Sequence, residues 1–230
     1  MSSGFISSRH LRVIGILLAL AALATLPGCW VYSIEPLYDE SISPLDPDLT
    51  SDQNLVGSWV QVGEDCPSTL TIIADDLRKT TTTSDKHTTT ATEPRYGLIL
   101  TPETSGTSCK SDDKPSRYEG HLVKLGDRRF LDVFPQSDEV CDLCLPMHSF
   151  MLLALANDHL DLIPLDRDWL MQAISAKQVH LPYIPVGHGI EDPLALTAPS
   201  RELKDLLRKH ADDKVAFKPD SELALKFKRK

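Results

Sequence analysis

Five cysteines are the first candidates for chemistry in this sequence, and two of them stand close together as Cys141-Asp-Leu-Cys144. This spacing is typical of a redox dithiol, in which a lowered pKa makes the first thiol a thiolate. Sites of that kind place the first cysteine at the N-terminus of a helix. Here strands are predicted on both sides, and the carboxylate of Asp142 disfavours a neighbouring thiolate, so the pattern favours a structural role.

Cys66 and Cys109 bring the cysteines available for pairing to four. Cysteines of exported proteins usually form disulfides, and four of them allow three pairings between which the sequence does not choose. The alternative is a zinc site built from Cys141, Cys144, His148 and one more ligand. The other cysteines stand far away in the sequence, so we expect structural disulfides, no metal site and no cofactor.

Other side chains that could do chemistry have simpler structural explanations. His121, His148 and His159 each fall on a predicted strand, where a histidine is usually hydrogen-bonded or exposed. Asp166-Arg-Asp168 begins a helical pattern, and Asp166 is suited to cap that helix. The chain has no Gly-x-Ser-x-Gly, P-loop, His-Glu-x-x-His or dinucleotide fingerprint. The sequence therefore predicts no catalytic residue and a protein that is not an enzyme.

The fifth cysteine, Cys29, belongs to a different motif. A basic start without acidic residues is followed by an uncharged apolar run from Val13 to Thr25, which is the organisation of a secretory signal. Leu26-Pro-Gly-Cys29 then resembles the lipobox of bacterial lipoproteins. This resemblance implies cleavage between Gly28 and Cys29, with residues 1–28 as signal peptide, and attachment of lipid to Cys29.

Two other interpretations of this segment compete with the lipoprotein one. The 22 uncharged residues between Arg12 and Glu35 are about enough to span a bilayer as an uncleaved helix, although Pro27 and Gly28 interrupt it. An ordinary secretory signal with a chance cysteine is the third. A lipoprotein would lie in the bacterial cell envelope, anchored in membrane lipid. In a bacterium with two membranes, an aspartate directly after the lipidated cysteine favours retention in the inner membrane. Trp30 stands at this position instead, so in such a bacterium we expect the outer membrane.

Charge and composition limit the partners of the protein. With 24 basic and 33 acidic residues the chain has a net charge of −9, and loss of Arg9 and Arg12 with the signal makes the mature charge −11. Nucleic-acid binding needs a concentrated basic surface, so we expect no such partner. A hydrophobic content of 41% is ordinary for a globular protein.

The remaining 202 residues divide into an N-terminal segment and one body. Residues 29–54 predict a lipidated cysteine and an extended tether, because Pro36, Pro44 and Pro47 exclude a long helix. Residues 55–230 predict a single β-rich domain. Within it the threonine-rich segment 79–92 lacks large apolar residues, which predicts a solvated hairpin or loop.

Alternating and apolar runs in the body predict many short strands and two helices. Gly126-Asp127 and Asn157-Asp158 predict tight turns between strands. The helices begin near Arg167, capped by Asp166, and at Arg201, capped by Ser200. The strands are expected over 56–62, 68–73, 96–101, 118–124, 129–134, 148–155, 159–163, 179–186, 194–197 and 222–228. This pattern predicts a mainly β (α+β) fold, an antiparallel barrel or sandwich with two short helices packed outside.

Gly57-Ser-Trp59, on the first strand of the body, resembles the Gly-x-Trp of lipocalin-like barrels. In those barrels the tryptophan plugs the closed end, so the resemblance implies a lipocalin-like barrel with Trp59 as its plug.

A wider resemblance runs over most of residues 29–230. The chain resembles a family of uncharacterised bacterial lipoproteins, which implies no particular activity. It departs from that family in its threonine-rich segment and in four extra cysteines. The matching segments are 33–38, 55–59, 121–126, 130–135, 148–150, 165–170 and 209–213.

The sequence thus predicts a non-enzymatic protein that is anchored in membrane lipid through Cys29. Its body is expected to bind a small apolar ligand inside a barrel or, alternatively, a protein of the envelope. Ligand binding requires a sizeable apolar cavity at the end opposite Trp59. Protein binding requires an exposed apolar patch or edge strand. A thiol-redox protein that uses Cys141 and Cys144 is the third hypothesis.

Overall fold

The structure is a computed structural model, and it describes most of the chain that follows the predicted signal. The described residues are 30–39, 46–75, 79–84, 87–103, 114–136, 147–186 and 193–230, with backbone alone over 79–84 and 87–92.

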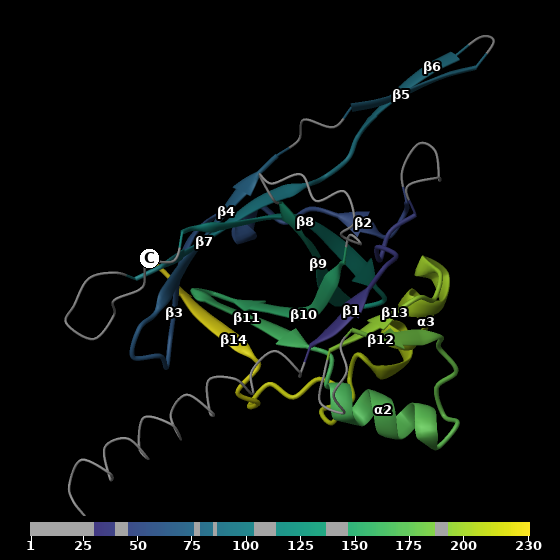
Figure 1. Ribbon diagram of the computed structural model, residues 1–230. Coiled ribbons are helices and arrows are strands. Elements are labelled where there is room, and N and C mark those ends of the chain that lie inside the picture. Colours follow the sequence, from purple (N-terminus) through teal and green to yellow (C-terminus); the bar gives the residue numbers. More distant parts are fainter. Residues whose placement is uncertain are drawn as a thin grey trace, which may run out of the picture.

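Eight strands form a closed antiparallel barrel (Figure 1). Seven of them pair in chain order, and β14 then pairs with both β11 and β3, which closes the ring. The strands are β3 (Gly57–Gln61), β4 (Ser68–Ala74), β7 (Tyr96–Pro102), β8 (Ser116–Leu125), β9 (Arg128–Gln136), β10 (Ser149–Ala156), β11 (His159–Pro164) and β14 (Leu225–Arg229). The prediction of a mainly β, lipocalin-like barrel is therefore confirmed.

Two tight turns at one end of the barrel follow directly from the sequence. Leu125 pairs with Arg128, so Gly126 and Asp127 alone join β8 to β9, and Gly126 has a φ of +65°. Between β10 and β11, Asn157 has a φ of +53°. Glycine and asparagine adopt this left-handed conformation most easily, so both predicted turns are confirmed.

The barrel wall is buried on both faces where it meets the helices. Successive residues of a strand point to opposite faces. The pair Leu122 and Leu131 therefore points into the barrel, whereas the adjacent pair Val123 and Phe130 points outward, and all four are buried. One apolar core thus fills part of the barrel, and a second lies between its outer surface and the helices.

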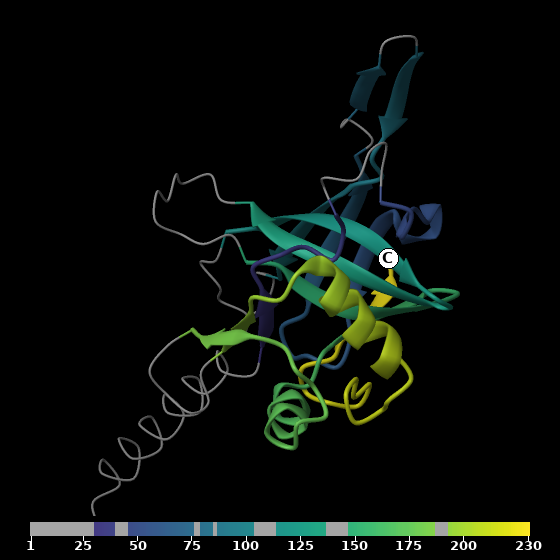
Figure 2. The ribbon, with the colours of Figure 1, turned by 90° about the vertical axis from the view of Figure 1, so that its right-hand side faces the viewer.

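The chain leaves the barrel after β11 and returns with β14. In between it forms α2 (Arg167–Ser175), β12 (Tyr183–Pro185), β13 (Leu194–Leu196) and α3 (Ser200–His210). Both helices pack on the outside of the barrel, as predicted (Figure 2). Neither of these helices, within the described ranges, is long and apolar enough to cross a membrane.

The two helix starts differ in how well the sequence predicts them. Asp166 caps α2 as expected, since its carboxylate accepts a hydrogen bond from the amide of Trp169 at 2.8 Å. Ser200 does not cap α3: it is the first helical residue, and Pro199 stands at the cap position without a side-chain hydrogen bond. The Ser200 hydroxyl instead donates to the carbonyl of Tyr38 at 3.4 Å.

The N-terminal segment is extended, as its prolines predict, but it is not a free tether. β1 (Val31–Ser33) pairs in parallel with β13, and β2 (Leu49–Thr50) pairs with β8. Leu37 is fully buried. Extended backbone is also the conformation of a β-strand. The prolines that exclude a helix therefore do not prevent this segment from pairing with two sheets. The described part of the predicted tether 29–54 therefore packs against the body.

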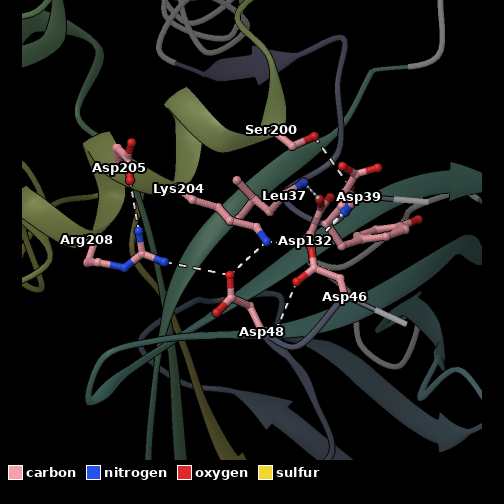
Figure 3. A network of polar contacts seen from close by, with 10 residues as sticks. Leu37, Asp39, Asp46, Asp48, Asp132, Ser200, Lys204, Asp205 and Arg208 are labelled. Carbon is pink, nitrogen blue, oxygen red and sulfur yellow. Dashed lines mark hydrogen bonds and ion pairs between the residues drawn. The ribbon is translucent and has the colours of Figure 1, made fainter. Parts of the chain in front are cut away.

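Polar contacts fasten this segment to α3 and to the barrel (Figure 3). The ammonium of Lys204, on α3, forms ion pairs with the carboxylates of Asp46 and Asp48. The amide of Leu37 donates to Asp132 of β9 at 2.6 Å. Lys204 and Asp46 are both buried, so each depends on the other for charge compensation.

Replacing Lys204 with methionine is expected to lower the free energy of unfolding by about 3 kcal/mol, because it leaves the buried carboxylate of Asp46 without its cation. Urea denaturation measures this loss. Lys209 is an exposed lysine of the same helix, and Lys209→Met is the matched control, with an expected change within about 0.5 kcal/mol. Equal effects of the two substitutions would show that the buried ion pair does not stabilise the fold.

The threonine-rich segment forms a hairpin that projects from the barrel between β4 and β7 (Figures 1 and 2). Its strands are β5 (Lys79–Ser84) and β6 (His87–Thr92), which pair only with each other. Of the two predicted alternatives for 79–92, the hairpin is the one that the backbone adopts.

Candidate ligand-binding site

The barrel interior contains an apolar cavity of about 510 Å³ at one end. This volume lies within the roughly 300–1,000 Å³ that is usual for small-molecule sites. The walls come from the inward-facing residues Leu70, Leu98, Leu100, Leu131, Val133, Met151, Leu162, Leu225 and Phe227. The remaining lining residues are Trp30, Tyr32, Tyr118, Pro135, Met147 and Ser149. None of these described residues carries a charge.

The opposite end of the barrel is filled by side chains. Trp59 is fully buried there, with its indole N–H donating to the carbonyl of Leu55 at 2.8 Å. The guanidinium of Arg229 lies over the ring, 4.2 Å from its centroid, which is a favourable cation–π arrangement. Other buried side chains that fill this end, and that do not line the cavity, are Ile72, Tyr96, Leu122, Leu153 and Leu160.

Gly120 shapes the boundary between the filled and hollow parts of the barrel. A Cβ atom at this position would lie 2.5 Å from Leu98 and 3.4 Å from Leu131, and both of these leucines line the cavity. The absent side chain therefore lets the two leucines approach β8 and pack over it. A larger residue at position 120 would push them into the cavity.

Three aromatic side chains with polar tips line the cavity along with the aliphatic wall. Trp30 and Tyr32 come from β1 and the residue before it, and Tyr118 comes from β8. Burial, and then the neighbouring Tyr118, raise the pKa of Tyr32, so its hydroxyl stays neutral and can hydrogen-bond. Sequence reasoning missed Trp30 and Tyr32 because it assigned them to a tether. The sequence did contain a signal for a role of these residues in the site: both lie within three positions of Cys29, in a chain with only 6% aromatic residues.

Two of the three strand histidines lie in a polar cluster outside the barrel, away from the cavity. The imidazole of His121 lies 2.8 Å from a carboxylate oxygen of Glu93, and the ring of Tyr38 packs against it with centroids 4.2 Å apart. His148 pairs through Nδ1 with Asp132 at 2.8 Å. The third, His159, is exposed on β11. The first two histidines therefore connect the N-terminal segment to the barrel wall.

Burial lowers the pKa of His121, although the carboxylates of Glu93, Asp132 and Glu119 act in the opposite direction. The folded protein then binds fewer protons here than the unfolded chain does. The contribution of His121 to stability is complete above its pKa in the unfolded chain, about 6.5. It is lost as pH falls from there through the lower pKa of His121 in the folded protein.

Acidification from pH 7.5 to pH 5 is therefore expected to lower the free energy of unfolding, and His121→Gln should reduce that dependence. Burial also lowers the pKa of His210, which both proteins retain and which acts in the same direction. Urea denaturation of both proteins across this range measures the difference. If the difference in free energy of unfolding between the wild-type protein and His121→Gln does not change with pH, the prediction is contradicted.

Only one of the predicted site cysteines lies among the described residues. Cys66 is exposed in the turn between β3 and β4, at the cavity end of the barrel, and it is disulfide-bonded. Cys29, Cys109, Cys141 and Cys144 lie outside the described residues. The pairing of the cysteines and the redox alternative thus remain predictions. No group of three or more metal-ligating side chains occurs within the described part of the chain.

The site as a whole is an uncharged apolar chamber in a rigid barrel wall, with Tyr32, Tyr118 and Ser149 as its hydroxyl-bearing residues. Such a chamber can hold an apolar molecule by excluding water from it, and can orient a polar end through one or two hydroxyls. Comparison with known proteins found no match to this chain among protein-family models, curated proteins or solved structures.

Proposed function

We propose that this protein binds a small apolar ligand in the barrel cavity, as a lipoprotein anchored in the cell envelope through Cys29. The observation that carries the proposal is the uncharged cavity of about 510 Å³ at the end opposite Trp59. An eight-stranded barrel is just wide enough either to be filled by side chains or to hold one small ligand. Here the aliphatic and aromatic residues at one end leave a cavity, which is the arrangement that ligand binding needs.

Binding of an environment-sensitive apolar dye, such as a phenylnaphthylamine, tests the proposal. We expect saturable binding at one site per molecule of the mature chain carrying Cys29→Ser, which avoids the need for detergent. The bound dye should be displaced by long-chain alcohols. Dye fluorescence that rises without saturating, or that long-chain alcohols leave unchanged, would argue against a defined site.

The anchor has its own test. Replacing Cys29 with serine removes the thiol that accepts lipid, so the protein is expected to move from the membrane fraction to the soluble fraction of the envelope. Two or three acyl chains hold a protein durably, because each buried methylene contributes about 0.8 kcal/mol. Fractionation and immunoblotting measure the change. Retention of the variant in the membrane would refute lipidation and favour an uncleaved helix.

A second candidate function, binding of an envelope protein, is favoured by one observation. Tyr183 and Ile184 are adjacent, exposed apolar residues on β12, which is an edge strand of the small sheet. Exposed edge strands can pair with another chain. Loss of a co-purifying envelope protein from a Tyr183→Ser, Ile184→Ser variant that still binds the dye would support this function.

A further inference from the structure

The mouth of the cavity lies at the point where the proposed lipid anchor joins the body. Trp30 lines the cavity and directly follows Cys29, and consecutive Cα atoms are about 3.8 Å apart. The next residues allow no slack, because Val31 pairs with Leu194 and Leu37 is fully buried. An anchor at Cys29 would therefore hold this end of the barrel against the membrane surface.

The aromatic residues near the mouth suit that position. Tryptophan and tyrosine combine an apolar ring with a polar tip, and they are enriched where membranes meet water. Trp30, Tyr32 and Tyr118 belong to the cavity lining. At this end they can meet the membrane surface, beside the exposed residues Glu64 and Asp65 in the turn between β3 and β4.

The lining also limits the chemistry of the ligand. Its wall is apolar and uncharged over the described residues, so the part of the ligand that enters should be a hydrocarbon. A methylene group takes up about as much space as a water molecule in the liquid, roughly 30 Å³, so 510 Å³ holds about 17 such groups. That is about the volume of one long acyl chain. The hydroxyls of Tyr32, Tyr118 and Ser149 are the groups that can meet a polar head.

The geometry points to a single-chain lipid, drawn directly from the membrane that holds the anchor, as the ligand of this cavity. The chain enters the barrel past Trp30 and Tyr32, and the head group stays at the membrane surface. This inference rests on the proposed function and adds to it the class of the ligand and the side from which it comes.

Photo-crosslinking with the full lipidated protein tests the inference. The protein is reconstituted in phospholipid vesicles that contain a lysophospholipid with a diazirine at the end of its acyl chain. We expect label on the cavity residues Leu131 and Met151. Anchoring raises the effective concentration of the lipid at the mouth, so Cys29→Ser protein added to the same vesicles should be labelled at least about tenfold less.

Competing lysophospholipids of increasing chain length measure the depth of the site. Measured as displacement of the dye from Cys29→Ser protein in vesicle-free solution, where the chain transfers from water, each added methylene should strengthen competition about fourfold until the cavity is filled. A free fatty acid of the same length is also added from solution as a competitor. Competition by this fatty acid shows that a single acyl chain is the ligand, and it does so independently of whether the natural ligand comes from the membrane. Equal labelling of anchored and Cys29→Ser protein by the vesicle lipid would overturn the membrane source.

Three further outcomes separate this inference from the proposed function. If Cys29→Ser protein binds the dye but vesicle lipid never labels the anchored protein, the inference fails and the proposed function stands. If, in addition, the anchored protein cannot bind the dye, the cavity is occupied by the protein's own acyl chain. If neither protein binds dye or lipid, both proposals fail.

Discussion

Met151→Trp is expected to abolish ligand binding, with a loss of affinity of at least about 100-fold, while the barrel stays folded. Met151 is buried on β10 and lines the cavity, so an indole at this position would occupy the space that the ligand needs. Overpacking in a filled core costs about 1–3 kcal/mol, and the adjacent empty volume should keep the cost here at the lower end of that range. Dye titration measures the affinity, and urea denaturation measures the stability.

The matched control is Ile73→Trp. Ile73 is 49% exposed on the outer face of β4, so an indole there changes neither the cavity nor the core. Wild-type affinity is expected for this variant. Unchanged dye binding by Met151→Trp would mean that the ligand binds somewhere other than in the barrel.

Trp59→Ala is expected to lower the free energy of unfolding by about 4 kcal/mol. Truncating a fully buried tryptophan removes its apolar contacts and leaves a cavity, which typically costs about 3–5 kcal/mol. The carbonyl of Leu55 also loses its donor, and the guanidinium of Arg229 loses the ring that it covers. Urea denaturation is again the measurement.

Two other substitutions test the cause of that loss. Trp59→Phe retains part of the ring volume but not the hydrogen bond, so an intermediate loss is expected. Trp169→Ala, on α2, removes a tryptophan that is only partly buried and should cost less. A loss below about 1 kcal/mol for Trp59→Ala would show that the filled end of the barrel does not depend on this side chain.

Local features of the sequence predicted most of the barrel strands. Alternating apolar residues between turn signals identified the barrel strands β3, β4 and β7 to β11 within a few residues, because a half-buried strand imposes that pattern whatever its partner is. Gly126 and Asn157 identified two turns, since few other residues adopt a positive φ. Asp166 identified the start of α2 for an equally local reason.

The features that the sequence did not predict depend on distant partners. Val31 pairs with Leu194, and nothing near either residue specifies the other. The cavity was expected only as a requirement of ligand binding, because its existence depends on how side chains from seven barrel strands and β1 share one space. Ser200 resembled a helix cap in the sequence, but its hydroxyl meets the carbonyl of Tyr38, which is 162 residues away.

The closure of the barrel by β14 has a consequence for when a ligand can be taken up. Phe227 pairs with Gln61 on β3 and with Leu160 on β11, so both strands have an unpaired edge until β14 arrives. During synthesis the other barrel strands emerge before β14, and a chain that crosses a membrane unfolded has no chamber at all. If the protein is exported as proposed, the proposed ligand would therefore be acquired after export, in the compartment where the protein folds.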